Sequence, residues 1–184
     1  MGGKVTLSSS KIGSLWVTVA YTDGPVLLAN SIPTEDREES IATTVKSLKG
    51  RGITSFEESN TETGADLARK ILLCSDSVSL SFEGMPEFTR TVLACVRKIP
   101  AGSVATYKEI AVVAGRPRAY RAVGNIMATH PFPYLIPCHR VIRSDRSLGG
   151  YGPNPETKAK FLAQEGVDFV NGRARVRHPR AQGK

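Results

Sequence analysis

Polar and apolar residues alternate in the first part of the chain with the period of two that indicates β-strands. In residues 14–21 (SLWVTVAY) every second side chain is a large apolar one, which predicts a strand with a buried face. A turn signal follows at residues 22–25 (TDGP), and residues 26–32 can return as a second strand. The chain therefore begins with a predicted pair of strands.

Two amphipathic helices and one more strand are predicted before residue 85. Apolar positions recur at helical spacing in residues 34–48, whose first turn is acidic, and again in residues 61–73. Residues 78–82 (VSLSF) are short and β-prone, which predicts a strand. Nothing in residues 1–84 points to chemistry, so we interpret them as a scaffold of sheet and helix.

The apolar spacing becomes helical after FEGMP at residues 82–86. A helix is predicted from Pro86 to the PAGS break, with Cys95 on its apolar face. We therefore expect Cys95 to lie in the core as a small hydrophobe. The last predicted helix, residues 154–166, carries Glu165 at its C-terminal end. The helix dipole disfavours a carboxylate there, so Glu165 needs another partner.

Two short helices joined by a turn form the centre of the second half. Thr106 and Glu109 match a capping box, so helices are expected over residues 106–115 and 119–129. The spacing resembles a helix-turn-helix; the alternative is an ordinary helical pair with a solvated surface. The second helix has a small outer face from which Arg121 projects, as a helix that presses into a DNA groove requires. Its predicted inward stripe consists of Tyr120, Val123 and Met127.

The composition, with 40% hydrophobic and 23% charged residues among 184, is typical of a globular protein. There is no apolar run long enough to span a bilayer, so no membrane partner is expected. Cys74, Cys95 and Cys138 are too few and odd in number for a disulfide framework, which favours a reducing compartment. They also lack the paired short spacing of zinc modules, so we expect no metal site and no cofactor.

The charge is distributed unevenly along the chain. The formal net charge is +8, yet residues 1–84 hold 8 basic and 11 acidic side chains, whereas residues 85–184 hold 17 basic and 6 acidic ones. The second part would therefore attract a polyanion such as nucleic acid, although a merely basic surface is the alternative. The basic terminal residues 171–184 are expected to form a frayed tail.

The candidate for chemistry is Cys138, in the proline-punctuated segment PFPYLIPCHRVI at residues 131–142. Prolines stiffen the approach, so the backbone holds this cysteine in place. Thiolate is the reactive form, and His139 could take the proton directly or through water. Glu165 could orient that histidine and stabilise its cation. The alternative is a buried structural cysteine beside a surface histidine.

The segment IPCHRVI resembles the active-site signature of the O6-alkylguanine-DNA alkyltransferases, also called methylated-DNA–protein-cysteine methyltransferases. The resemblance extends over roughly residues 86–166. Upstream it includes RAVGNIM and PFPYLIPCHRV, and downstream it includes LGGYG and a helix ending in EG. It implies an α+β fold. A small RNase H-like domain of β-sheet and helix (residues 1–84) would precede a mostly helical domain with a helix-turn-helix (85–170) and the basic tail (171–184).

The resemblance implies DNA repair by direct reversal: an alkyl group, chiefly methyl, passes irreversibly from O6 of a flipped guanine to Cys138, once per molecule. His139 would take the thiol proton through a water, Glu165 would hold His139, and Tyr107 would contact the base as a fourth catalytic residue. Arg121 would enter the space left by the extruded nucleotide. The other implied residues are Ala119, Ala122, Gly124 and Ala128 on the DNA-binding face and Met127, Pro133, Val141, Tyr151 and Gly152 around the substrate pocket.

The implied partner is double-stranded DNA containing O6-alkylguanine, bound by a monomer in the cytoplasm of a prokaryote or the nucleus of a eukaryote. Two positions depart from the family pattern: His130 replaces an asparagine, and Tyr120 replaces a smaller residue. One alternative is a non-enzymatic, lesion-sensing or regulatory helix-turn-helix protein, but such relatives replace the reactive cysteine. A cysteine hydrolase, which would turn over repeatedly, is the other alternative.

Overall fold

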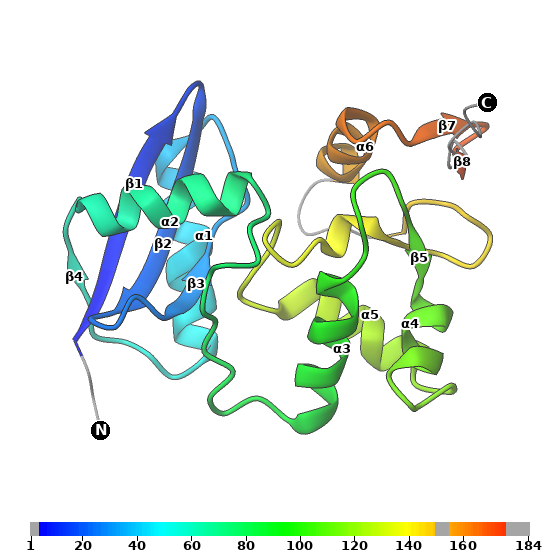
Figure 1. Cartoon of the computed structure of the whole chain (residues 1–184), viewed down its shortest axis with the longest axis horizontal. Helices are drawn as coiled ribbons and strands as arrows, with labels where there is room; N and C mark the ends of the chain where they lie inside the picture. Colours follow the sequence, from blue (N-terminus) through cyan, green and yellow to red (C-terminus); the bar gives the residue numbers. More distant parts are fainter. Residues whose placement is uncertain (1–3, 150–154, 176–184) are drawn as a thin grey trace, which may run out of the picture. The chain divides into compact units, whose positions relative to one another are not determined.

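The computed structural model describes residues 4–149 and 155–175 of the chain. These residues have a mixed α+β fold, as predicted, and six α-helices (Figure 1). The chain divides into two compact units: the first comprises the chain up to Met85 together with residues 129–136, and the second comprises the remainder. Within the described ranges, no helix is both long enough and apolar enough to cross a membrane.

A four-stranded sheet forms the first unit's core, with strands β1 (Val5–Ile12), β2 (Leu15–Thr22), β3 (Leu27–Asn30) and β4 (Glu57–Glu58). The order is β3-β2-β1-β4, antiparallel except for the β1–β4 pair. The predicted strands β2 and β3 are confirmed. The sequence analysis missed β1, because buried serines interrupt its apolar pattern. One of them, Ser9, exchanges a 2.9 Å hydrogen bond with the Thr18 hydroxyl on β2.

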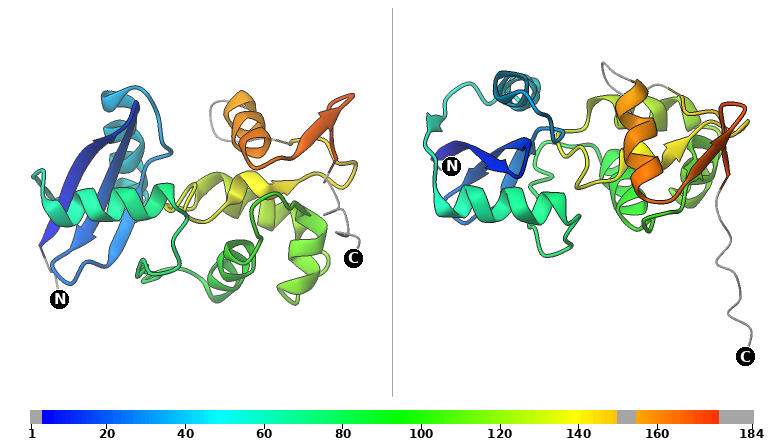
Figure 2. Two further views of the ribbon diagram at one scale, coloured as in Figure 1. Left: turned by 45° about the horizontal axis from the view of Figure 1, so that its top comes forward. Right: turned by 90° about the horizontal axis from the view of Figure 1, so that it is seen from above.

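Helices α1 (Arg37–Gly50) and α2 (Glu62–Leu72) cover opposite faces of this sheet, which confirms both predicted helices (Figure 2). Each begins at a side-chain cap: the Asp36 carboxylate accepts from two N–H groups of α1, and the Thr61 hydroxyl accepts from one of α2. Such caps satisfy donors that a helix leaves unpaired at its start. Because helices lie on both faces, both sets of alternating side chains in β2 are buried.

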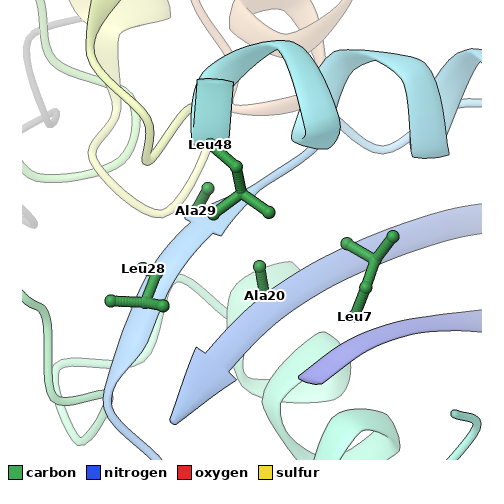
Figure 3. Close-up of a cluster of buried hydrophobic side chains, with 5 residues drawn as sticks. All are labelled: Leu7, Ala20, Leu28, Ala29 and Leu48. Carbon is green, nitrogen blue, oxygen red and sulfur yellow. The ribbon is translucent and has the colours of Figure 1, made fainter. Parts of the chain in front are cut away.

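The two helix–sheet interfaces differ in character. Under α1 lies a cluster of buried apolar side chains from the strands and the helix, namely Leu7, Ala20, Leu28, Ala29 and Leu48 (Figure 3). On the other face α2 comes so close to β1 that a Cβ at Gly64 would lie 2.2 Å from the Ser8 Oγ. Only glycine permits that approach.

Residues 78–82 do not form the predicted strand. Leu80 makes one isolated parallel bridge to Leu27, supported by hydrogen bonds from Leu27 N–H to the Ser79 carbonyl and from Ser81 N–H to the Leu27 carbonyl. The segment meets the edge of β3 at a single residue pair, which is too short for a ladder.

Residues 129–136, which lead towards Cys138, are anchored in the first unit. The Asn30 backbone N–H donates to the Pro131 carbonyl at 2.9 Å, and the Asn30 side-chain amide donates to the Pro133 carbonyl at 2.7 Å. Phe132 is fully buried. The approach to Cys138 is therefore held by hydrogen bonds and burial as well as by its prolines.

The second unit contains mostly helices and very short strands. In order they are α3 (Glu87–Arg97), β5 (Ala105–Thr106), α4 (Tyr107–Val113), α5 (Tyr120–Thr129), the 3-10 turn η1 (Cys138–Arg140), β6 (Val141–Ile142), α6 (Pro155–Gln164), β7 (Asp168–Val170) and β8 (Arg173–Arg175). The four helices predicted in this half are confirmed to within two residues at each end. Cys95 is half-buried on α3 and not part of the core as predicted, because it lies at the margin of the buried face.

Strands β7 and β8 form a hairpin after α6, which the sequence analysis did not anticipate (Figure 2). The expected frayed tail does not hold for residues 171–175. Ala174 is buried in a cluster with Ile142, Leu162 and Val167. Its backbone N–H also donates to the Arg146 carbonyl at 2.9 Å, so this strand is held in place.

Helices α4 and α5 follow each other through a short turn. The predicted capping box between Thr106 and Glu109 is present at the start of α4. On α5, Val123 and Met127 are buried as predicted, but Tyr120 is 46% exposed, so its predicted inward position is wrong. Tyr120 is the first residue of α5, and the buried face of this helix begins only at Val123.

Candidate active site around Cys138

Cys138 is the first residue of a 3-10 turn. The turn spans Cys138–Arg140, after which β6 pairs in parallel with β5 through Val141 with Ala105. Successive side chains of a 3-10 helix diverge by about 120°, so Cys138 and its neighbour point in different directions. Because β5 leads directly into α4, this pairing sets the cysteine turn beside the beginning of that helix. Cys138 itself is only 4% exposed.

The His139 ring is fully buried and faces the end of α6. Its Nε2 lies 2.8 Å from the Glu165 Oε1, and the Phe161 ring packs edge-on against it with centroids 5.5 Å apart. Burial lowers the pKa of His139, while the hydrogen bond and charge of Glu165 act in the opposite direction. A neutral imidazole that donates from Nε2 keeps Nδ1 as its proton acceptor.

Arg140 holds the same carboxylate from a second side. Its Nε donates to both Glu165 oxygens at 3.1 and 3.0 Å, its Nη2 donates to Oε1 at 2.8 Å, and its Nη1 donates to the Ile99 carbonyl. Burial alone would raise the pKa of Glu165, but the hydrogen bonds and charges of His139 and Arg140 outweigh burial and lower it to about 2. The carboxylate is therefore an anion at neutral pH.

Tyr107, the first residue of α4, is held against a glycine after β6. Gly149 has a φ of +71°, and a Cβ there would lie 3.2 Å from the Tyr107 hydroxyl. Burial raises the pKa of Tyr107, a negative charge on Cys138 raises it further, and Arg143 lowers it. Tyr107 is therefore a protonated hydrogen-bond donor at neutral pH.

The sequence analysis missed two charged residues at this site, Arg140 and Lys158. Lys158 lies on α6. It is fully buried, and its ammonium donates to the Val141 carbonyl at 2.5 Å and lies 5.8 Å from the centre of the Tyr107 ring. Burial lowers its pKa to about 8. The signal was its spacing: Lys158 precedes the buried Phe161 and Leu162 by three and four positions, which places it on the inner stripe of the helix.

Residues 87–167 match the family model of the 6-O-methylguanine DNA methyltransferase, DNA binding domain. The methylated-DNA–protein-cysteine methyltransferase of Methanothermobacter thermautotrophicus is 46% identical over 90 residues, which cover 49% of this chain and 50% of that protein. The rat protein of the same name is 46% identical over 82 residues, 44% of this chain and 39% of that protein. The chain thus spans half or less of the length of these curated relatives.

Two solved structures resemble most of the chain. O6-methylguanine-DNA methyltransferase from Pyrococcus kodakaraensis is 25% identical with a TM-score of 0.68, and the comparison covers 89% of this chain and 99% of that one. Mycobacterium tuberculosis O6-methylguanine methyltransferase is 26% identical with a TM-score of 0.65, covering 88% and 92%. The chain thus resembles the O6-methylguanine-DNA methyltransferase family, over residues 87–167 by sequence and over most of its length by fold. The family resemblance inferred from the sequence is confirmed.

The remaining residues expected from the methyltransferase family fall into three groups. On α5, Arg121, Ala122 and Ala128 are exposed, while Ala119, before α5, and Gly124 are partly covered. Met127 and Val141 are buried in the second unit, whereas Pro133 belongs to the first. Tyr151 and Gly152 lie outside the described residues.

His130, which the sequence analysis singled out as a departure from the family pattern, is buried in the first unit. Its Nδ1 accepts from the Phe132 N–H at 3.3 Å, while its Nε2 has no hydrogen-bond partner among the described residues. Burial lowers its pKa to about 4. A neutral imidazole therefore supplies the acceptor that a side-chain amide could also supply.

Proposed function

We propose that the protein repairs O6-alkylated guanine in double-stranded DNA by transferring the alkyl group to Cys138, once per molecule. The arrangement of Cys138, His139 and Glu165 around one 3-10 turn, in a domain that matches the methyltransferase family, is the observation that carries this proposal. Methyl is the expected group. The names of the curated relatives support the activity.

The proposed reaction begins with removal of the thiol proton. Nε2 of His139 donates to Glu165, so Nδ1 takes the proton of Cys138 through a bridging water. The resulting imidazolium is stabilised by the Glu165 carboxylate, which Arg140 keeps ionised. This division of roles lets a single turn hold both the nucleophile and its base.

In the transfer step the Cys138 sulfur attacks the alkyl carbon. The S–C bond forms as the C–O6 bond breaks, and the electron pair moves onto the guanine. The guanine then takes a proton from Tyr107, which is protonated at neutral pH, and the proton held by His139 returns to Tyr107 through solvent. Guanine is a poor leaving group as an anion, so this proton is needed. The thioether product has no proton to lose, which makes the protein inactive after one event.

We further propose that α4 and α5 act as a helix-turn-helix whose second helix enters the minor groove. Minor-groove recognition is degenerate, which suits a protein that must scan any sequence. Arg121 is exposed on α5 and would occupy the space of the extruded nucleotide. The small residues around it, Ala119, Ala122, Gly124 and Ala128, would permit close approach to the sugar-phosphate walls. The excess of basic side chains after residue 84 supports attraction to duplex DNA.

The flipped base would lie beside the cysteine turn. The carbonyls of Cys138 and Val141 would accept from the guanine amino group. Each carbonyl oxygen has two lone pairs, of which one already accepts within the protein, from the Val141 N–H and the Lys158 ammonium respectively. Met127, Pro133 and Tyr151 would form walls of the pocket, and the Gly152 N–H would approach O6. In domain terms, residues 1–84 would be an RNase H-like scaffold, residues 85–170 the alkyltransferase domain and residues 171–184 a basic tail.

Intact mass before and after incubation with duplex DNA containing O6-methylguanine tests the proposal. We expect a gain of one methyl group, located on Cys138 by peptide mass, with a product-to-protein ratio of one. Cys138→Ala should keep its affinity for DNA and lose the transfer. A Cys138→Ala protein that still cleared the lesion would refute the assignment. Lesion binding without any gain of mass would support the lesion-sensing alternative, and repeated turnover would support a hydrolase.

A further inference from the structure

A lysine ammonium with no exposed surface lies in the second unit, at Lys158. Lysine is almost never fully buried unless it is paired, because removing an ammonium from water is costly. Glu156 and Lys160, two positions before and after Lys158 on α6, are both exposed. The burial of Lys158 is therefore specific to its position on the helix. The proposed function does not by itself require this charge.

The contacts of Lys158 converge on the cysteine turn. Its Nζ donates to the Val141 carbonyl, and the Val141 N–H in turn donates to the Cys138 carbonyl, which closes the 3-10 turn. On its other side the ammonium lies 5.8 Å from the centre of the Tyr107 ring, which attracts a cation. The positive charge is thus held between the turn that carries the thiol and the ring of Tyr107.

The charged and titratable groups that face Lys158 come from three elements. Arg143, after β6, and His139, in η1, would oppose the ammonium when they carry charge. Tyr107, on α4, is neutral at physiological pH. Cys138 is the group whose negative form favours the charged lysine. By reciprocity, the charged lysine favours the negative form of Cys138.

We propose that Lys158 is a positioning residue that stabilises the thiolate of Cys138 and fixes the Val141 carbonyl beside it. This inference rests on the proposed function only in taking Cys138 as the acceptor, and it assigns the acidity of the thiol to a lysine in addition to the histidine. The thiol proton still leaves by way of His139. Lys158 has no proton-transfer role in this proposal; its ammonium form contributes positive charge to the ground state of the reaction at neutral pH.

Ultraviolet absorbance of the thiolate during a pH titration tests this inference without DNA or lesion. The difference between each protein and its Cys138→Ala counterpart isolates the Cys138 thiol. Lys158→Met removes the charge and retains an unbranched side chain. We expect it to raise the midpoint for Cys138 by about one pH unit. The matched control Lys160→Met, two positions further along the same helix and exposed, should leave the midpoint unchanged.

A midpoint that is unchanged in a folded Lys158→Met protein would overturn the inference, whether or not the protein transfers alkyl groups. Conversely, a shifted midpoint in a protein that never gains a methyl group would retain the role of Lys158 and refute the proposed function. If circular dichroism shows that Lys158→Met does not fold, Lys158→Gln is titrated in its place. If neither variant folds, the titration midpoint of Cys138 in the protein with Lys158 intact tests the inference. A Cys138 midpoint below the ordinary value of about 8.5 supports the inference, and one at or above that value overturns it.

Discussion

Arg140 and Glu165 form a forked ion pair in which one guanidinium donates to both carboxylate oxygens, while His139 shares one of those oxygens. The arginine and the histidine are adjacent in sequence, so the same turn that presents Cys138 also supplies two side-chain partners of the carboxylate. Glu165 thereby joins the C-terminal end of α6 to η1. Its unfavourable position at the end of a helix is offset by two cationic or hydrogen-bonding neighbours.

Replacing Glu165 with glutamine should slow alkyl transfer by about 100-fold, because the imidazolium of His139 would lose its counter-charge. The buried Arg140 would also lose its partner, which should lower the free energy of unfolding by about 2–3 kcal/mol. Single-turnover transfer rates and urea denaturation measure the two effects. Glu156→Gln, an exposed position on the same helix, is the control and should change neither. Unaltered transfer in a folded Glu165→Gln protein would remove this carboxylate from the mechanism.

Stability should fall as the pH decreases from about 6.5 towards 4, in part because of His130. Its folded pKa of about 4 lies below that of the unfolded chain, so protons bind preferentially to the unfolded state in this window. The stabilisation is complete above the unfolded pKa and is lost as the pH falls. His130→Asn should reduce the loss by about 2 kcal/mol, measured as unfolding free energy at pH 7.5 and pH 4.5. Parallel pH profiles for the two proteins would contradict this.

Gly149→Ala should impair the chemistry beyond its cost in stability. A Cβ would press on the Tyr107 hydroxyl at 3.2 Å and shift the proposed proton donor. Gly172 offers a matched control, since it has nearly the same φ (+72° against +71°) and open space around the added Cβ. Both alanine variants should lose about 1 kcal/mol of stability from backbone strain. Only Gly149→Ala should slow transfer; equal transfer rates in both would separate Tyr107 from the reaction.

Arg121→Ala should slow methyl transfer from duplex DNA but not from the free O6-methylguanine base. The free base needs no extrusion, whereas unstacking in duplex DNA costs a few kcal/mol that a filling side chain offsets. We expect a loss of about tenfold or more with the duplex, a conservative share of that cost. Arg90→Ala, an exposed cation on α3, controls for the loss of charge alone. If both substrates slowed equally, Arg121 would act on the pocket and not on base extrusion.

The sequence predicts those elements whose signal lies in a regular period or a local cap. Strands β2 and β3, all six helices and the capping box of α4 follow from alternation, helical spacing and cap residues. Strand β1 escaped because its run of serines is typical of a loop, although Ser9 is buried and pairs with the Thr18 hydroxyl. The hairpin β7–β8 escaped because Ala174 is the one buried side chain in residues 168–175, and further support comes from backbone contacts, such as the hydrogen bond from Ala174 N–H to the Arg146 carbonyl.

At the candidate site, sequence reasoning finds the groups proposed to react and misses the charges that surround them. Cys138 and His139 stand out by their residue types. Glu165 stands out because a carboxylate at the C-terminal end of a helix is unfavourable, which indicates that it has another partner. Arg140 and Lys158 were passed over because a basic side chain is expected at the surface. Their burial depends on tertiary contacts with Glu165 and with a carbonyl of the neighbouring strand, which no local pattern encodes.

Residues 129–136 belong to the first unit although they connect α5 to the cysteine turn. The chain leaves the N-terminal scaffold at Met85, builds α3 to α5, and comes back to insert Phe132 before it reaches Pro137. A truncated protein that begins at Pro86 would retain every residue matched by the family model yet leave that phenylalanine without its surroundings, at a cost of about 2–3 kcal/mol. Deleting the scaffold would thus loosen the stretch of chain immediately ahead of Cys138.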